Sequence, residues 1–93
     1  MHSQGETMKL AGHITLKKVG EGAIIFDARK GGYLQLNPTA YFVLRQTLEG
    51  LEPEQIADKL TDEFRVTGDT ALTDTIACLV TFESHKWLHA AAS

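Results

Sequence analysis

Short runs of alternating or continuous apolar residues, separated by glycines, occupy the first part of the chain. Residues 13–17 alternate polar and apolar side chains, which is typical of a half-buried strand. Residues 23–28 carry apolar side chains on both faces, as expected for a central strand or for one with a face lined by helices. Residues 33–36 form a third strand, with Leu34 and Leu36 on one face. Because tight glycine turns separate the three runs, we predict a three-stranded antiparallel meander.

Apolar residues recur at helical spacing in the rest of the chain. Asn37 precedes a proline and is expected to cap a first helix, for which Gly50 supplies a stop. A second helix begins at Pro53, and its apolar residues lie four positions apart on one face. The third helix is the longest and covers roughly residues 70–88, with Asp69 as its expected cap.

Three strands followed by three helices indicate an α+β fold, with the helices on one face of the antiparallel sheet. A short glycine-containing connection joins the second and third helices, and such a pair beside strands gives a winged-helix-like shape. We expect one folded domain over residues 12–88, a flexible N-terminal tail over residues 1–11 and a short C-terminal tail over residues 89–93.

Composition narrows the classes of partner and location. The chain has 93 residues, with nine basic and twelve acidic side chains, so its net charge of −3 does not favour a phosphate-binding surface. Cys78 is the only cysteine, which excludes an internal disulfide and fits a reducing cytoplasm. No apolar run approaches the length of a membrane span, and the polar start lacks the apolar stretch of a signal peptide. We therefore expect a cytoplasmic protein that contacts neither membrane nor nucleic acid.

Candidate catalytic chemistry is sparse. His85 and His89 have the i, i+4 spacing of a metal-binding pair, but no glutamate follows His85 and no third ligand is evident. Cys78 stands in mid-helix among apolar neighbours, where a cysteine usually acts as a small hydrophobic residue. No phosphate-binding glycine loop is present. The sequence therefore predicts no catalytic residue, no metal and no cofactor, and we expect a protein that is not an enzyme.

The segment from Phe26 to Ala40 carries a family resemblance. It contains an acidic residue, a glycine turn, an aromatic strand and then Leu-Asn leading into a helix; an Ile-Ala pair and a long last helix follow. These features are Asp27, Gly32, Tyr33, Leu36-Asn37, Ile56-Ala57 and the helix that ends near Leu88. In this order and spacing the chain resembles PqqD-like domains over about residues 12–88.

The resemblance implies a non-catalytic recognition element that binds the leader of a ribosomally made precursor peptide. The leader would add as a strand beside the third strand and lie against the third helix. The chain looks most like the free-standing leader-binding proteins of lasso-peptide biosynthesis, whose leaders use a tyrosine and a proline as anchors. In that setting the partner is a transglutaminase-like leader peptidase, and an asparagine-synthetase-like cyclase acts afterwards.

Elementary physics favours the same kind of binding. An edge strand exposes unpaired N–H and C=O groups that a peptide can complete, while side-chain pockets supply specificity. Which stripe of the third helix lines the groove is left open, and so is a homodimer through the edge strand. The expected peptide-binding residues are Tyr33, Leu34, Gln35 and Leu36 of the third strand and Leu72, Thr73, Ile76, Ala77 and Val80 of the third helix.

Two other functions remain as alternatives. The first is a PqqD-type chaperone that serves a different modifying enzyme. The second is a winged-helix DNA-binding protein, but the third helix carries only Lys86 as a cation, near its far end, together with Asp74 and Glu83. A recognition helix needs cations to meet phosphates, so the sequence favours a peptide ligand over DNA.

Overall fold

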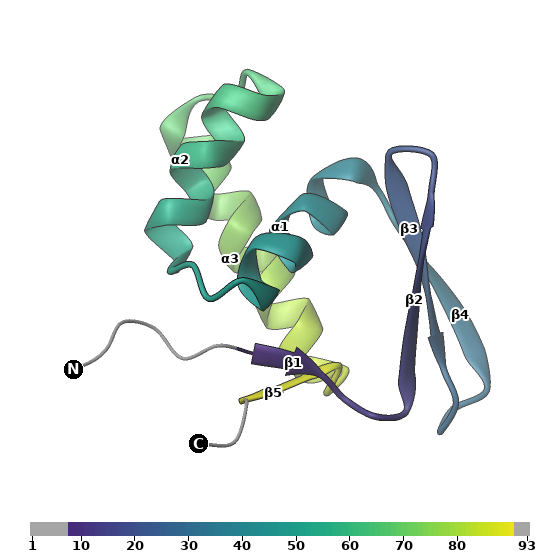
Figure 1. Ribbon diagram of the computed structural model, residues 1–93. Helices are drawn as coiled ribbons and strands as arrows, with labels where there is room; N and C mark the ends of the chain where they lie inside the picture. Colours follow the sequence, from purple (N-terminus) through teal and green to yellow (C-terminus); the bar gives the residue numbers. More distant parts are fainter. Residues whose placement is uncertain (1–7, 91–93) are drawn as a thin grey trace.

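A computed structural model describes residues 8–90 of the chain. Three strands form an antiparallel sheet of order β2-β3-β4, and a two-stranded antiparallel pair, β1-β5, joins the two ends of the described chain (Figure 1). The strands are β1 (Met8–Leu10), β2 (Ile14–Val19), β3 (Gly22–Asp27), β4 (Gly32–Leu36) and β5 (Leu88–Ala90). The helices are α1 (Pro38–Leu48), α2 (Pro53–Phe64) and α3 (Gly68–Ser84). The predicted α+β, winged-helix-like order of three meander strands and three helices is confirmed.

The helices gather on one side of the three-stranded sheet (Figure 1). Helix α1 packs on β3, and α2 and α3 pack on α1 and on each other. The core between them combines the inner face of the sheet with the facing sides of the helices and one aromatic residue beyond α3. Its largest fully buried members are Ile25, Val43, Leu44, Ile56, Leu60, Phe82 and Trp87. Burial of this apolar surface supplies the main driving force for the fold.

Two helix starts test the predicted caps. The Oδ1 atom of Asn37 accepts a hydrogen bond from the Ala40 N–H at 2.8 Å, so the predicted cap of α1 is confirmed. The predicted Asp69 cap of α3 is wrong, because the helix begins at Gly68 and Asp69 already lies in its first turn. Thr67, whose backbone is extended, caps α3 by accepting a hydrogen bond from the Thr70 N–H at 3.2 Å.

The predicted end of α3 is also wrong, because the helix stops at Ser84 and not near residue 88. Lys86 adopts a left-handed conformation with φ 58° and donates its N–H to the Glu83 carbonyl at 3.0 Å. The Trp87 N–H donates to the Phe82 carbonyl at 3.1 Å, which completes a Schellman-type termination. The chain then leaves the helix axis and enters β5.

The end strands were not expected from the sequence. Strand β1 lies inside the segment predicted as an N-terminal tail, and it pairs Lys9 with His89 in register. Strand β5 likewise contains the first residues of the predicted C-terminal tail. Residues 1–7 and 91–93 lie outside the described part of the chain, so the tails predicted there stay predictions. Over residues 8–90, no helix is both long and apolar enough to cross a membrane.

Candidate functional site

Hydrogen bonds at the end of β3 show which of its residues direct their backbone N–H and C=O groups to β4. The Ala28 N–H donates to the His13 carbonyl at 2.8 Å, toward the β2 side. The Asp27 carbonyl accepts from the Gly31 N–H at 2.7 Å, toward the β4 side. Successive residues of an antiparallel strand direct their backbone groups to opposite neighbours. Every second residue of β3, counted back from Asp27, therefore bonds to β4.

The register then identifies the backbone groups that β4 leaves open. The partners of Asp27, Ile25 and Ala23 on β4 are Gly32, Leu34 and Leu36, which therefore use their N–H and C=O groups inside the sheet. The intervening residues, Tyr33 and Gln35, direct theirs to the outer edge. Strand β4 thus presents donors and acceptors to a further strand.

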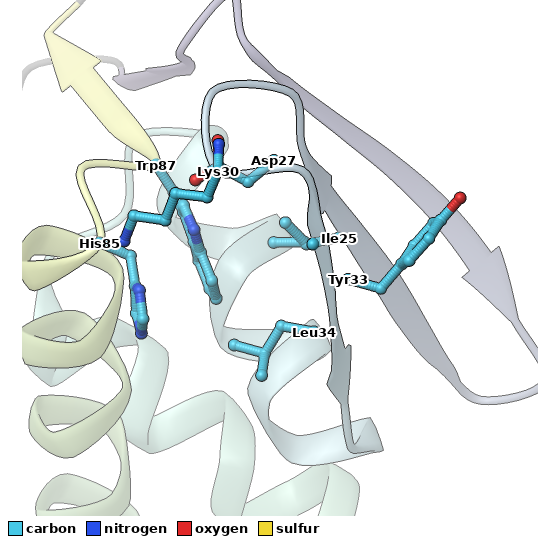
Figure 2. A pocket seen from close by; sticks show the side chains of 8 residues that line it. Ile25, Asp27, Lys30, Tyr33, Leu34, His85 and Trp87 are labelled. Carbon is cyan, nitrogen blue, oxygen red and sulfur yellow. The ribbon is translucent and has the colours of Figure 1, made fainter.

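An apolar groove runs between this edge and α3. One hollow of about 160 Å³ lies where the end of β4 meets α1 and α3, and its lining is Leu36, Ala40, Ala77, Cys78, Thr81 and Phe82. A second hollow of about 160 Å³ lies nearer the start of β4, where the side chains of Ile25 and Leu34 face Trp87 and His85 (Figure 2). Each volume is below that of a typical small-molecule pocket and suits one side chain. Because Leu34 and Leu36 share the inner face of β4, we treat the two hollows as one groove.

The other face of β4 carries different chemistry. The side chain of Tyr33 points away from the groove (Figure 2) and is 76% exposed. Its ring packs on Phe26 of β3, with 4.9 Å between the ring centroids. Gln35 shares this face and is exposed. Tyr33 and Gln35 therefore border the open edge through their backbones, while Leu34 and Leu36 supply side chains to the groove.

Comparison with known proteins bears on this geometry. The profile of the family described as "Coenzyme PQQ synthesis protein D (PqqD)" matches residues 22–88, which is more than half of the chain and spans both walls of the groove. The chain belongs to the PqqD family. The resemblance to PqqD-like recognition domains, which the segment around β4 first indicated, is confirmed.

Two solved structures share the fold of this PqqD-family chain. The first is described as "Lasso peptide synthetase B1 complexed with the leader peptide"; it is 28% identical, the match covers 88% of this chain and 96% of that one, and the TM-score is 0.77. The second, "TbiB1 in Complex with the TbiA(beta) Leader Peptide", is 20% identical, with coverage of 91% and 99% and a TM-score of 0.74. At that identity the second match shows the fold alone. None of the curated proteins compared matches this chain.

Helix α3 brings only part of the expected peptide-binding set to the groove. Of the five residues predicted on this helix, Ala77 lines the groove. Leu72 is half-buried against the core, and Thr73 is exposed. Ile76 and Val80 are 48% and 59% exposed and line neither hollow. A role for any of these residues in binding a peptide stays a prediction.

Sequence reasoning missed several groove residues in this family member. From α3 they are Cys78, Thr81 and Phe82. The others are Ala40 of α1, His85 and Trp87 beyond α3, and Ile25, Asp27, Lys30 and Gly32 of the β3–β4 hairpin. The signal was present, because residues 77, 78, 81 and 82 form two adjacent pairs separated by one helical turn. It was not decisive, because apolar residues surround α3 on several sides.

The cysteine and histidine candidates occupy structural positions. Burial, together with the nearby Asp74 carboxylate, raises the pKa of the Cys78 thiol, so the reactive thiolate is disfavoured there. His85 caps the end of α3 and stacks on Trp87 with 4.8 Å between ring centroids, whereas His89 belongs to β5. The two histidines therefore do not share a helical face. Over residues 8–90, no group of three His, Cys, Asp or Glu side chains is arranged to hold a metal ion.

Proposed function

We propose that this protein binds the leader of a ribosomally synthesised precursor peptide by strand addition to β4, and that it delivers the peptide to a processing enzyme. The observation that carries the proposal is an open strand edge directly beside an apolar groove. The solved relative at 28% identity, described as complexed with a leader peptide, supports a peptide ligand.

In this proposal, backbone groups hold the leader and side chains select it. Tyr33 and Gln35 would exchange backbone hydrogen bonds with the leader, and these bonds are indifferent to its sequence. Specificity would come from leader side chains that enter the hollows beside Leu34 and Leu36. The leader loses conformational freedom when it binds, so its affinity should depend on a few such anchors. The tyrosine and proline of lasso leaders are suitable candidates for them.

On its outer face the leader would meet other neighbours. In an added strand, every second side chain points to the side of the sheet that carries Tyr33 and Gln35. The exposed Tyr33 ring, already packed on Phe26, offers a flat apolar surface to such a side chain. Tyr33 therefore contributes a cross-strand contact, while Ala77 and its neighbours on α3 contribute the groove wall.

In this proposal the protein performs no chemistry itself. It orders the leader and presents the adjoining cleavage site to a transglutaminase-like leader peptidase, and the cyclase acts later. Such a role places it in the cytoplasm, where precursor peptides are made. A PqqD-type chaperone for a different modifying enzyme is the second candidate, and the description of the matched family favours it. Both roles use the same groove and differ in the enzyme that receives the peptide.

DNA binding is the weaker alternative. Helix α3 would be the recognition helix, and between Gly68 and Ser84 it carries Asp69, Asp74 and Glu83 but neither lysine nor arginine. These carboxylates would face phosphates across the major groove, which opposes binding.

The test is a titration of the labelled leader of the precursor encoded beside this protein. We expect a dissociation constant between about 10 nM and 10 µM, as is usual for a short peptide held by a few anchors. A scrambled leader of the same composition serves as the control. If the folded protein binds neither peptide, the proposed function is wrong. Adding the candidate peptidase or another modifying enzyme to the complex then separates the two roles.

A further inference from the structure

A basic opening lies at the end of the groove next to the β3–β4 turn. It is lined by the turn, by the residue before β2 and by the residues that end α3. The lining side chains are His13, Asp27, Arg29, Lys30, Ser84, His85 and Lys86. Asp27, Lys30 and His85 also line the apolar hollow beside Leu34, so the opening continues the groove. We call these seven residues the basic mouth.

The charges of the basic mouth are unbalanced. Arg29, Lys30 and Lys86 are basic side chains, and Asp27 is the one carboxylate among the lining residues. The whole chain carries −3, so this positive surplus is local. Both Arg29 and Lys30 are exposed and hold no ion pair among those found over residues 8–90.

The single carboxylate is already engaged. Oδ1 of Asp27 accepts hydrogen bonds from the backbone N–H groups of Arg29 at 2.9 Å and Lys30 at 3.2 Å. His13 Nε2 lies 4.0 Å from the same oxygen atom. Asp27 is only 7% exposed, so its carboxylate serves mainly the turn and offsets at most one of the three positive charges. The Lys30 side chain instead extends across the groove toward His85 (Figure 2).

We propose that the basic mouth binds an acidic side chain of the leader peptide. The inference rests on the proposed function and deepens it: the protein selects a leader in which a glutamate or aspartate adjoins one end of a run of apolar side chains at alternating positions. A strand added along β4 has inward side chains opposite Leu36, Leu34 and Gly32 in turn. The next inward side chain of the leader lies two residues beyond the one opposite Gly32, and it enters the basic mouth.

The shape of the basic mouth favours a peptide carboxylate over nucleic acid. Its cations sit around one opening at the end of a groove that is apolar along the rest of its length. A nucleic-acid site needs cations repeated along a track, since each neutralised phosphate adds to the affinity. A single carboxylate held by one or two guanidinium or ammonium groups matches the number of charges present.

The test compares two charge reversals of equal size. Arg29→Glu/Lys30→Glu alters the basic mouth, and Lys17→Glu/Lys18→Glu alters an adjacent lysine pair on β2, away from the groove. We expect the first variant to bind the labelled leader about tenfold more weakly and the second to stay within about twofold of wild type. The difference in affinity between the two variants should decrease when the salt concentration rises from about 50 mM to about 500 mM, because these charges are exposed. Lys86→Glu, on the opposite wall, should weaken binding independently of the turn.

A charge swap supplies the decisive arm. Each Asp or Glu of the leader is changed to Lys in turn, and every peptide is titrated against wild type and Arg29→Glu/Lys30→Glu. One reversed leader should bind the variant better than it binds wild type. If no reversed leader is rescued, or if the variant and Lys86→Glu bind as wild type does, the inference is wrong. If wild type still binds the native leader in that case, the proposed function stands without the basic mouth. If wild type does not bind the native leader, the proposed function itself is contradicted. Tight binding of a DNA duplex by wild type, lost in the variant, would likewise overturn the peptide assignment.

Discussion

The two edges of the three-stranded sheet differ in their protection against a further strand. The β2 edge carries Lys17 and Lys18 near its end, and Lys18 lies on the inner face, where its Nζ donates to the Gly20 carbonyl at 2.7 Å. The β4 edge contains no charged residue between Gly32 and Leu36. Lysines on an edge, and inward-pointing ones above all, oppose strand addition because pairing would desolvate them. Strand addition is therefore disfavoured at the β2 edge and open at the β4 edge.

The space beside each edge differs as well. On the inner face of β2, Ile14 is buried and Leu16 packs against the core. On the inner face of β4, Leu34 is 41% exposed and borders the groove. Both edges offer the same backbone chemistry, so the difference lies in side chains alone. Selectivity between two otherwise equivalent edges is thus produced by a pair of lysines on one and a groove beside the other.

The largest effect is expected from a proline at the open edge. Gln35→Pro removes an N–H that points away from β3, so it should leave the sheet intact while deleting a hydrogen bond to the leader and placing a ring in its path. We expect leader affinity to fall about hundredfold, as measured by titration of the labelled leader. Circular dichroism and the melting temperature should stay close to those of wild type.

Lys18→Pro is the matched control on the other edge. By the same alternation, Lys18 directs its N–H away from β3, so proline is equally compatible with the sheet. Leader affinity should remain within about twofold of wild type. Equal losses for the two variants, or a greater loss for Lys18→Pro, would place the leader away from β4.

A smaller effect is expected when the groove is filled without touching the backbone edge. A Cβ atom at Gly32 would have nothing within 4 Å, and Gly32 lines the hollow beside Leu34. Gly32→Val should therefore fold normally, since β-branched residues suit strands, and should weaken leader binding about tenfold by occupying anchor space. Calorimetric titration measures the loss. Gly12→Val, also in open space, is the control and should bind normally; unchanged affinity for both would show that the hollow takes no anchor.

A third change removes the protection of the β2 edge. Lys17→Thr/Lys18→Thr replaces both lysines with residues that favour strands, so the β2 edge becomes as free of charged side chains as the β4 edge. We expect new self-association at high protein concentration, seen by sedimentation velocity as a weak dimer that wild type forms less readily. Leader affinity should change little, because β4 is untouched. A variant no more associated than wild type would mean that the lysines are not what protects β2.

Much of this architecture was predictable because its signals are local. Glycine turns and the Asn37 cap delimit the strands and α1 through short-range backbone chemistry. The end of α3 was not predictable in this way. Lys86 occupies the left-handed position where glycine is the usual residue, and Trp87 continues the apolar pattern although it has left the helix. The tertiary burial of Trp87 beside Phe82 decides the boundary.

The two walls of the groove also differ in how far the sequence predicts them. The open β4 edge followed from strand order, which the meander determines. The side of α3 that faces it did not, because Ile76 and Val80 are as apolar as Phe82 yet lie exposed. Helical period shows which residues share a face but not which face meets the sheet. That choice depends on how α1 and α2 orient α3, through contacts distant in sequence.

The smallest expected effect concerns the turn that begins β4. Burial alone would raise the pKa of Asp27, but the backbone N–H groups of Lys30 and Arg29, with the charges of His13 and Lys30, hold it below the ordinary value of 3.8. A carboxylate with a lowered pKa stabilises the folded state above its unfolded pKa, and this contribution is lost as the pH falls through the lower folded value. Asp27→Asn keeps an oxygen acceptor for the same N–H groups but cannot ionise. The melting temperature of wild type should therefore slightly exceed that of Asp27→Asn at pH 6, and the difference should shrink as the pH falls below 3.8. Thermal melts of both proteins between pH 6 and pH 2.5 measure it, and the comparison cancels the titration of all other carboxyls. A constant difference across this range would mean that the charge of Asp27 does not support the turn, and that the hydrogen-bond geometry alone places β4 and its open edge.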